Sequence, residues 1–217
     1  MSTSQDWDRA AEVVAAGADE LRGAPTHREI RAWAKRENVQ TKAMWPKVKT
    51  EMRKQLDLDY DELAAATVAA EAARLDAAAA DAPLVRLCVA GDAEVSTYAI
   101  CAAADDRQSW YGTFFDDDRI FDGSDESAER SAADKAVFLA GKVREHLGVP
   151  ALRLVIESSH PDISADMFTL SGNRHQVQVR VEHVETNPAV ALCRAPGYRT
   201  WREIPLQKLV EPAEVAS

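Results

Sequence analysis

The hydrophobic pattern is clearest between residues 84 and 157, where short apolar runs alternate with turn-forming residues. The first three runs occupy residues 84–90, 97–104 and 109–115, with a polar turn at 105–108. Residues 126–147 then carry apolar side chains at helical spacing, and residues 151–156 form a continuous apolar run. The pattern predicts three strands, a long helix and a fourth strand. Because a helix precedes it, we expect the fourth strand to lie parallel to an earlier one.

Strict alternation of apolar and polar side chains marks a fifth strand at residues 175–183. Val177, Val179 and Val181 fall on one side of it, and polar or charged residues fall on the other. This is typical of a half-buried strand. Asn187-Pro188 then begins a short helix that runs to Cys193.

Before residue 57 the apolar spacing changes to that of short helices. Residues 6–21 predict one amphipathic helix, which Gly23-Ala-Pro25 ends. Thr26 and Glu29 form a Thr-x-x-Glu capping box for a second helix. Asn38 suits a tight turn, and a third helix is expected at 41–56, with Pro46 in its first turn.

Residues 58–81 are rich in alanine and acidic side chains and contain neither glycine nor proline, which predicts a helical connector. We therefore expect an α+β protein in three parts. These are a helical module at 1–57, a connector at 58–83 and a mixed-sheet α/β domain at 84–217.

Composition is that of a globular protein: of 217 residues, 46% are hydrophobic and 29% charged. No apolar run reaches the length of about 18 residues expected of a membrane span, and the first residues lack a signal-peptide pattern, so we expect a cytoplasmic protein without membrane contact. Cys88, Cys101 and Cys193 stand singly in apolar contexts, as buried free thiols do. The acidic stretch from Asp116 to Glu126 lacks the spacing of a calcium loop and is expected to be solvated.

Charge is unevenly distributed along the chain. The net charge is −10, yet residues 22–54 contain ten Lys/Arg and three Glu, a local charge of +7, which leaves −17 for the remainder. Such asymmetry indicates a basic module joined to an acidic one.

Three short helices with a basic third helix are the pattern of a helix-turn-helix module. Over about a quarter of the chain the N-terminal residues also resemble the DNA-binding region of KfrA-type plasmid proteins. The similar residues are Ala10-Ala11, Leu21, Pro25-Thr26, Ile30-Arg31 and Pro46-Lys-Val-Lys49. The resemblance implies a DNA-contacting third helix, although this chain lacks the long coiled coil of that family. The phosphate contacts it implies are Lys42, Lys47, Lys49, Arg53 and Lys54, with Arg31 and Lys35 on the preceding helix as further candidates. The alternative is an ordinary solvated basic face.

The order of elements from Leu84 to about Ala195 resembles the ribonuclease H fold. That family holds two Mg²⁺ ions with carboxylates at the end of the first strand, in the first turns of the helix and at the end of the fourth strand. The matching positions are Asp92, Asp134 (or Glu129 slightly earlier) and Glu157. Asp92 follows Ala90-Gly91, beyond the expected place, and the helical position carries Asp instead of Glu. A fourth carboxylate has no clear match, since Glu182 and Glu185 are only nearby.

These patterns favour a DNA-binding protein whose ribonuclease H-like domain is a non-catalytic interaction module, requiring no cofactor. The first alternative is a divergent nuclease acting on DNA or an RNA–DNA hybrid. It would use Asp92, Asp134 and Glu157 to hold Mg²⁺ or Mn²⁺. The second alternative is a protein-interaction module without nucleic acid. A protein partner or a homodimer through the connector and the α/β domain is compatible with each.

Overall fold

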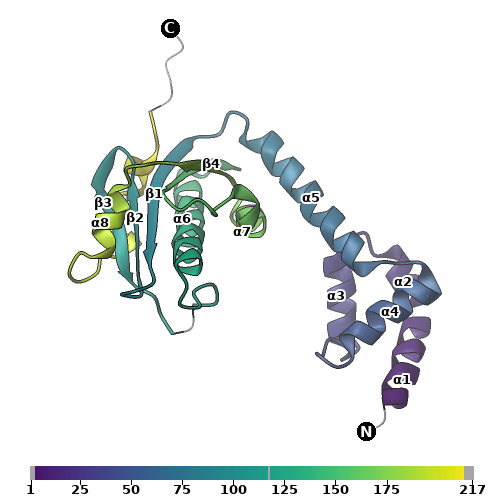
Figure 1. The fold of residues 1–217 in the computed structure, drawn as a ribbon. Helices are drawn as coiled ribbons and strands as arrows, with labels where there is room; N and C mark the ends of the chain where they lie inside the picture. The colour runs from purple at the N-terminus through teal and green to yellow at the C-terminus, as the bar shows by residue number, and fades with distance from the viewer. Residues whose placement is uncertain (1–2, 117, 213–217) are drawn as a thin grey trace. The chain divides into compact units, whose positions relative to one another are not determined.

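The protein is described by a computed structural model that covers residues 3–116 and 118–212 (Figure 1). The chain divides into two compact units, an N-terminal unit of Met1–Glu71 and a C-terminal unit of Ala72–Ser217. Helices dominate the first, and the second combines a five-stranded sheet with helices, which confirms the expected α+β class. In the described ranges, no helix is both long and apolar enough to cross a membrane.

The N-terminal unit consists of helices around one apolar core. Its helices are α1 (Thr3–Ala16), α2 (Ala18–Gly23), α3 (His27–Arg36), α4 (Trp45–Leu56) and the first part of α5 (Tyr60–Ala79). The apolar positions of the predicted stripes meet in this core, where Val14, Leu21, Ile30, Val48 and Met52 are fully buried. The predicted capping box is confirmed, since Glu29 accepts a hydrogen bond from the Thr26 backbone N–H at 3.2 Å.

Two helix boundaries differ from the prediction. The helix expected at 6–21 is interrupted at Gly17, where a Cβ atom would lie 2.6 Å from Trp33 Nε1, so the indole packs directly on the backbone. The third helix begins at Trp45 instead of Thr41. Pro46 has no N–H to donate to an earlier turn, so the helix has to start beside it.

Helix α5 contributes to both units. Tyr60 and Leu63 pack in the N-terminal core, whereas Leu75 and Ala79 pack with Ala82 and Ala151 in the C-terminal unit. The expected connector helix is therefore present, and its two ends are each anchored in a core.

The C-terminal unit is built on one mixed sheet of order β3-β2-β1-β4-β5. Its strands are β1 (Leu84–Asp92), β2 (Thr97–Ala102), β3 (Asp105–Thr113), β4 (Leu152–Ser158) and β5 (Val177–His183). The first three form an antiparallel meander, and β4 and β5 run parallel to β1. The predicted parallel return of the chain through a helix is thus confirmed.

Helices cover both faces of this sheet. Helix α6 (Asp125–Leu147) packs on one face together with α7 (Thr169–His175), and α8 (Pro188–Cys193) packs over β1 and β2 on the other (Figure 1). The three cysteines are free and buried where α8 meets the sheet, as expected, with Cys88 on β1, Cys101 on β2 and Cys193 at the end of α8. Short 3-10 helices lie at Ala165–Phe168, Trp201–Glu203 and Leu206–Leu209.

Two strand boundaries were predicted wrongly. The polar residues 105–108 belong to β3, because the register shifts between Cys101 and Ala102 and the strand resumes pairing at Asp105. His175 ends α7 instead of opening β5, since Gln176 adopts a left-handed conformation with φ of 56° that separates helix from strand.

Candidate functional site

The candidate nucleic-acid interface is formed by α3, α4 and the segment between them. Asn38 takes the predicted left-handed conformation, with φ of 57°, and Val39 is fully buried. Thr41 Oγ1 accepts a hydrogen bond from the Met44 backbone N–H at 3.2 Å. This hydrogen bond fixes the turn that leads into α4, and α4 itself packs against α1 in the apolar core.

Four of the seven predicted DNA contacts lie on α4, and all four have acidic partners. The ion pairs join Lys47 to Asp6 (2.7 Å), Lys49 to Asp61 (2.7 Å), Arg53 to Asp59 (3.3 Å) and Lys54 to Glu51 (2.9 Å). The hydrogen bond from Lys47 lowers the pKa of Asp6 below its usual value. Lys47 is the least exposed of these cations, with 15% of its side chain accessible.

These pairs explain why the basic segment does not make a basic unit. Residues 1–71 contain eleven Lys/Arg and thirteen Asp/Glu, a formal charge of −2. Acidic residues of α1, of the first turn of α5 and of the position just before α5 supply three of the four partners of the α4 cations. The local charge of +7 is therefore a property of the segment, and folding brings compensating carboxylates to it.

The other three predicted contacts have different surroundings. Lys35, Lys42 and Arg31 are exposed, and among the described residues no carboxylate forms an ion pair with any of them. With its amide oxygen turned toward α3, Gln40 accepts hydrogen bonds from Arg31 Nε (3.0 Å) and Nη2 (3.1 Å). This contact links the outer face of α3 to the turn that carries Lys42.

The carboxylates predicted for a metal site are held apart. Asp92, at the end of β1, pairs with Arg194 Nε at 2.8 Å. Glu157 projects toward the α8 face, where it accepts hydrogen bonds from Arg86 and Cys88. In contrast, Asp134 lies on α6.

The negative charge of Asp134 acts instead on His175, the last residue of α7. Burial lowers the pKa of His175, and the charge of Asp134 opposes that effect. Within the described ranges, no three His, Cys, Asp or Glu side chains are grouped so that they could hold a metal ion. The structure therefore does not bring Asp92, Asp134 and Glu157 together.

Glu129 occupies the place between β1 and β4 that the predicted trio was expected to fill. This α6 residue is only 4% exposed, and its carboxylate accepts hydrogen bonds from the Gly91 N–H (2.7 Å) and from Ser158 Oγ (2.5 Å). Burial raises the pKa of Glu129, and the two hydrogen bonds only partly oppose the rise. The carboxylate thus ties the ends of β1 and β4 to the first turns of α6.

Gly91 allows this close contact. A Cβ atom at Gly91 would lie 2.2 Å from the backbone carbon of Ala128, so only glycine lets β1 approach α6 here. A hollow of about 280 Å³ lies beside the contact, lined by Asp92, Asp125 and His160 among others. It presents carboxylates with one imidazole.

Two further charged groups were not recognised from the sequence. Arg86 on β1 binds Glu182, Glu157 and Glu211, and the hydrogen bond that it donates to Glu182 is the main cause of its raised pKa. Asp118 was expected in a solvated loop, but its side chain is 9% exposed. Sequence spacing predicts neither group, because the partners of Arg86 lie at least 71 residues away and Asp118 lies in an irregular segment before α6.

Asp118 organises the segment between β3 and α6. It accepts hydrogen bonds from Lys135, from Ser131 and from the backbone N–H groups of Ile120 and Phe121. Burial favours a higher pKa for Asp118, but these hydrogen bonds outweigh it and lower the pKa to about 2. The carboxylate is thus a structural anchor.

Comparisons of the chain with protein-family models, with curated proteins and with solved structures gave no match.

Proposed function

We propose that the N-terminal unit binds DNA and that the C-terminal unit is a ribonuclease H-like domain used for interaction and not for catalysis. The observation that carries the first part is the group of exposed cations Arg31, Lys35 and Lys42, which have no acidic partner among the described residues. Phosphate oxygens are suitable partners for such groups.

The paired cations of α4 are a second set of expected DNA contacts. Exposed ion pairs contribute little to stability, so a phosphate can replace the carboxylate at low cost. Arg53 is 70% exposed and Lys54 62%, whereas Lys47 is enclosed beside Asp6. We therefore expect Arg31, Lys35 and Lys42 to contact DNA first, Lys49, Arg53 and Lys54 to exchange partners on binding, and Lys47 to remain paired.

Support for the second part comes from the sheet. Its order, with β2 antiparallel to β1 and with β4 and β5 parallel to it, is the order expected of a ribonuclease H-like domain. Of the residues matched to that family's carboxylates, Asp92 pairs with Arg194 and Glu157 bonds to Arg86, and the residues that meet on the α6 face are Gly91, Glu129 and Ser158. One buried carboxylate that already accepts two hydrogen bonds is a poor substitute for a set of Mg²⁺ ligands.

The DNA proposal is tested by measuring the affinity of the full chain for a labelled duplex as a function of salt. Lys35→Ala combined with Lys42→Ala should weaken binding about tenfold and flatten the salt dependence, because fewer counterions are released. Asp59→Asn combined with Asp61→Asn should strengthen binding, since it frees Arg53 and Lys49 while asparagine keeps the cap that Asp59 provides for α5.

Lys208→Ala, which removes an exposed cation of the C-terminal unit, is the matched control and should leave affinity unchanged. Binding that is absent, or that responds equally to all three variants, would contradict the proposal. Addition of Mg²⁺ or Mn²⁺ to the same mixtures tests catalysis. Metal-dependent cleavage that Glu129→Gln abolishes would replace the non-catalytic assignment by the nuclease alternative.

A further inference from the structure

Strand β5 lies at one edge of the sheet, and in the part of the chain that the structure describes its only pairing partner is β4. Leu152 N–H donates to Gln176 O, and Val184 N–H donates to Ser158 O, so even-numbered residues of β5 direct their backbone groups toward β4. Since backbone direction alternates along a strand, the odd-numbered residues 179, 181 and 183 direct theirs outward. The opposite edge of the sheet differs, because Tyr111 of β3 exchanges two backbone hydrogen bonds with Arg199.

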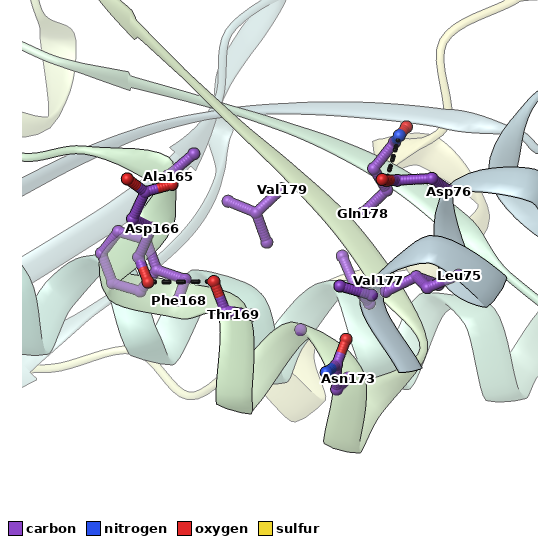
Figure 2. Close-up of a pocket in the computed structure, with 12 residues that line it drawn as sticks. Leu75, Asp76, Ala165, Asp166, Phe168, Thr169, Asn173, Val177, Gln178 and Val179 are labelled. Carbon is purple, nitrogen blue, oxygen red and sulfur yellow. Dashed lines mark hydrogen bonds between the residues drawn. The ribbon is translucent and has the colours of Figure 1, made fainter. Parts of the chain in front are cut away.

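Helix α5 limits the open part of this edge. Asp76 accepts a hydrogen bond from Gln178 Nε2 at 2.7 Å, which places the end of α5 beside the first residues of β5 (Figure 2). Among the described residues no other strand pairs with residues 179–183, and the centre of this stretch is Val181.

The side chains of this stretch complement themselves. If two copies of β5 pair antiparallel about Val181, Arg180 of each copy lies directly opposite Glu182 of the other. These are non-hydrogen-bonded positions, where side chains are closest. Glu182 also accepts a hydrogen bond from Arg86 through Oε2, but its side chain is 51% exposed, so in the dimer it would be shared between Arg86 and Arg180 of the second copy. A register shifted by one residue in each strand toward the start of β5 would instead set Arg180 opposite Arg180. In both registers odd-numbered residues lie opposite odd-numbered residues, so the outward backbone groups of 179, 181 and 183 can bond to those of the other copy. The charges favour the register centred on Val181.

We propose that this chain forms a two-fold symmetric dimer by antiparallel pairing of β5 edges, centred on Val181. The sheets of the two copies then become one continuous sheet. Val177, Val179 and Val181 lie on the side of β5 that packs toward α6. In the dimer, Val181 of one copy would contact Val181 of the other on this same side of the sheet. An isologous contact of this kind closes after two copies.

A hollow beside the edge leaves room for side chains of the second copy in this register. It has a volume of about 200 Å³ and lies between α5, the segment from Ala165 to Thr169 and β5 (Figure 2). Leu75, Phe168 and Val179 form apolar walls, and Asp76 and Asp166 lie at its rim. The register sets the second copy's His183 opposite Val179, at the mouth of this hollow and near the two carboxylates.

The dimer does not depend on DNA binding by the N-terminal unit. If both hold, two copies of the N-terminal unit belong to one particle, and binding to one DNA molecule gains from the raised effective concentration of the second copy. Oligomeric state and DNA affinity are measured separately, so failure of one proposal leaves the other standing.

Sedimentation velocity of the full chain over a range of concentrations tests the dimer. The wild type should show a concentration-dependent monomer–dimer equilibrium. Arg180→Glu sets two glutamates opposite each other in each cross-strand pair, and Glu182→Arg sets two arginines opposite each other. Each variant alone should therefore raise the dimer dissociation constant at least about tenfold. An equimolar mixture of the two variants should regain dimers. In the mixed dimer one copy carries a glutamate at both positions and the other carries an arginine at both, so each cross-strand pair again joins opposite charges.

Val181→Pro is an independent variant, since it removes an outward N–H that β4 does not use. It should abolish dimers while the circular dichroism spectrum stays that of the wild type. Arg174→Glu, a charge reversal on α7, is the control and should leave the equilibrium unchanged. A wild type that stays monomeric at all concentrations would overturn the proposal, as would a dimer that persists in either charge variant or a mixture that does not reassociate.

Discussion

The N-terminal unit pairs its charges at the surface, whereas the C-terminal unit encloses several of its own. Lys49 and Asp61 are 30% and 70% exposed, and water can replace either partner. Asp118 is 9% exposed and Glu129 is 4% exposed, and each is surrounded by donors from other elements. Exposed pairs can be exchanged for an incoming phosphate, while enclosed carboxylates fix the backbone around them. The contrast explains why we assign ligand binding to the first set and a structural role to the second.

The strongest test of the contrast is Gly91→Ala. The new methyl group would collide with the backbone of Ala128, which cannot rotate away, and would separate β1 from Glu129. We expect a loss of about 3 kcal/mol in the unfolding free energy of the C-terminal unit, measured by urea denaturation. Gly23→Ala in the N-terminal unit is the control, because the added Cβ there meets no other described residue within 4 Å. Equal stability of the two variants would show that the approach of β1 to α6 is not tight.

Asp118→Asn should cost about 2 kcal/mol at pH 7, because it weakens charge-assisted hydrogen bonds from Lys135 and Ser131. The pKa of Asp118 is lowered in the folded state, so its contribution is present above the unfolded pKa of about 4 and is lost as the pH falls toward 2. Urea denaturation of wild type and variant at several pH values should therefore give curves that converge in acid. A difference independent of pH would assign the effect to packing.

Glu129→Gln should have the opposite sign. The pKa of Glu129 is raised in the folded state, so the folded protein binds this proton more tightly, and ionisation at neutral pH opposes folding. We expect the variant to be more stable than the wild type by about 1 kcal/mol at pH 7, since a neutral amide replaces a buried charge. The advantage should shrink as the pH falls through the raised pKa toward the unfolded value of about 4. A variant that is less stable at pH 7 would mean that the ionised carboxylate holds Gly91 and Ser158 better than an amide does.

The smallest expected effect belongs to the surface pairs. Asp61→Asn should change the unfolding free energy of the N-terminal unit by about 0.5 kcal/mol or less, because the pair with Lys49 is largely exposed. Thermal denaturation at low and at high salt measures it, and the difference should decrease at high salt. A large, salt-independent loss would place Asp61 among the structural carboxylates and remove the contrast between the units.

Local signals predicted most elements correctly. The Thr26–Glu29 capping box, the left-handed Asn38, the long helix ending near Leu147 and the alternating Val177–Val181 strand all follow from residues within one or two turns of each other. The boundaries that were wrong involve distant groups or backbone irregularities. The Gly17 interruption, for example, reflects the Trp33 indole of another helix.

The candidate sites were less predictable. The sequence named the cations of α4, but their partners include Asp6, which lies 41 residues away from Lys47. The sequence also left Asp134 and Glu129 as alternatives for the carboxylate in the first turns of the long helix. Only the packing of α6 against β1 shows that Glu129 is the buried one.

The sequence by itself determined the fold class, the order of the helices and strands and the parallel return of β4, because periodicity, caps and turns act over a few residues. Tertiary structure decided which charges are compensated, which carboxylate is enclosed and which strand edge stays open. Those properties depend on contacts between residues far apart in the chain, and the energy of a charge is set by its surroundings in space and not by its neighbours in sequence.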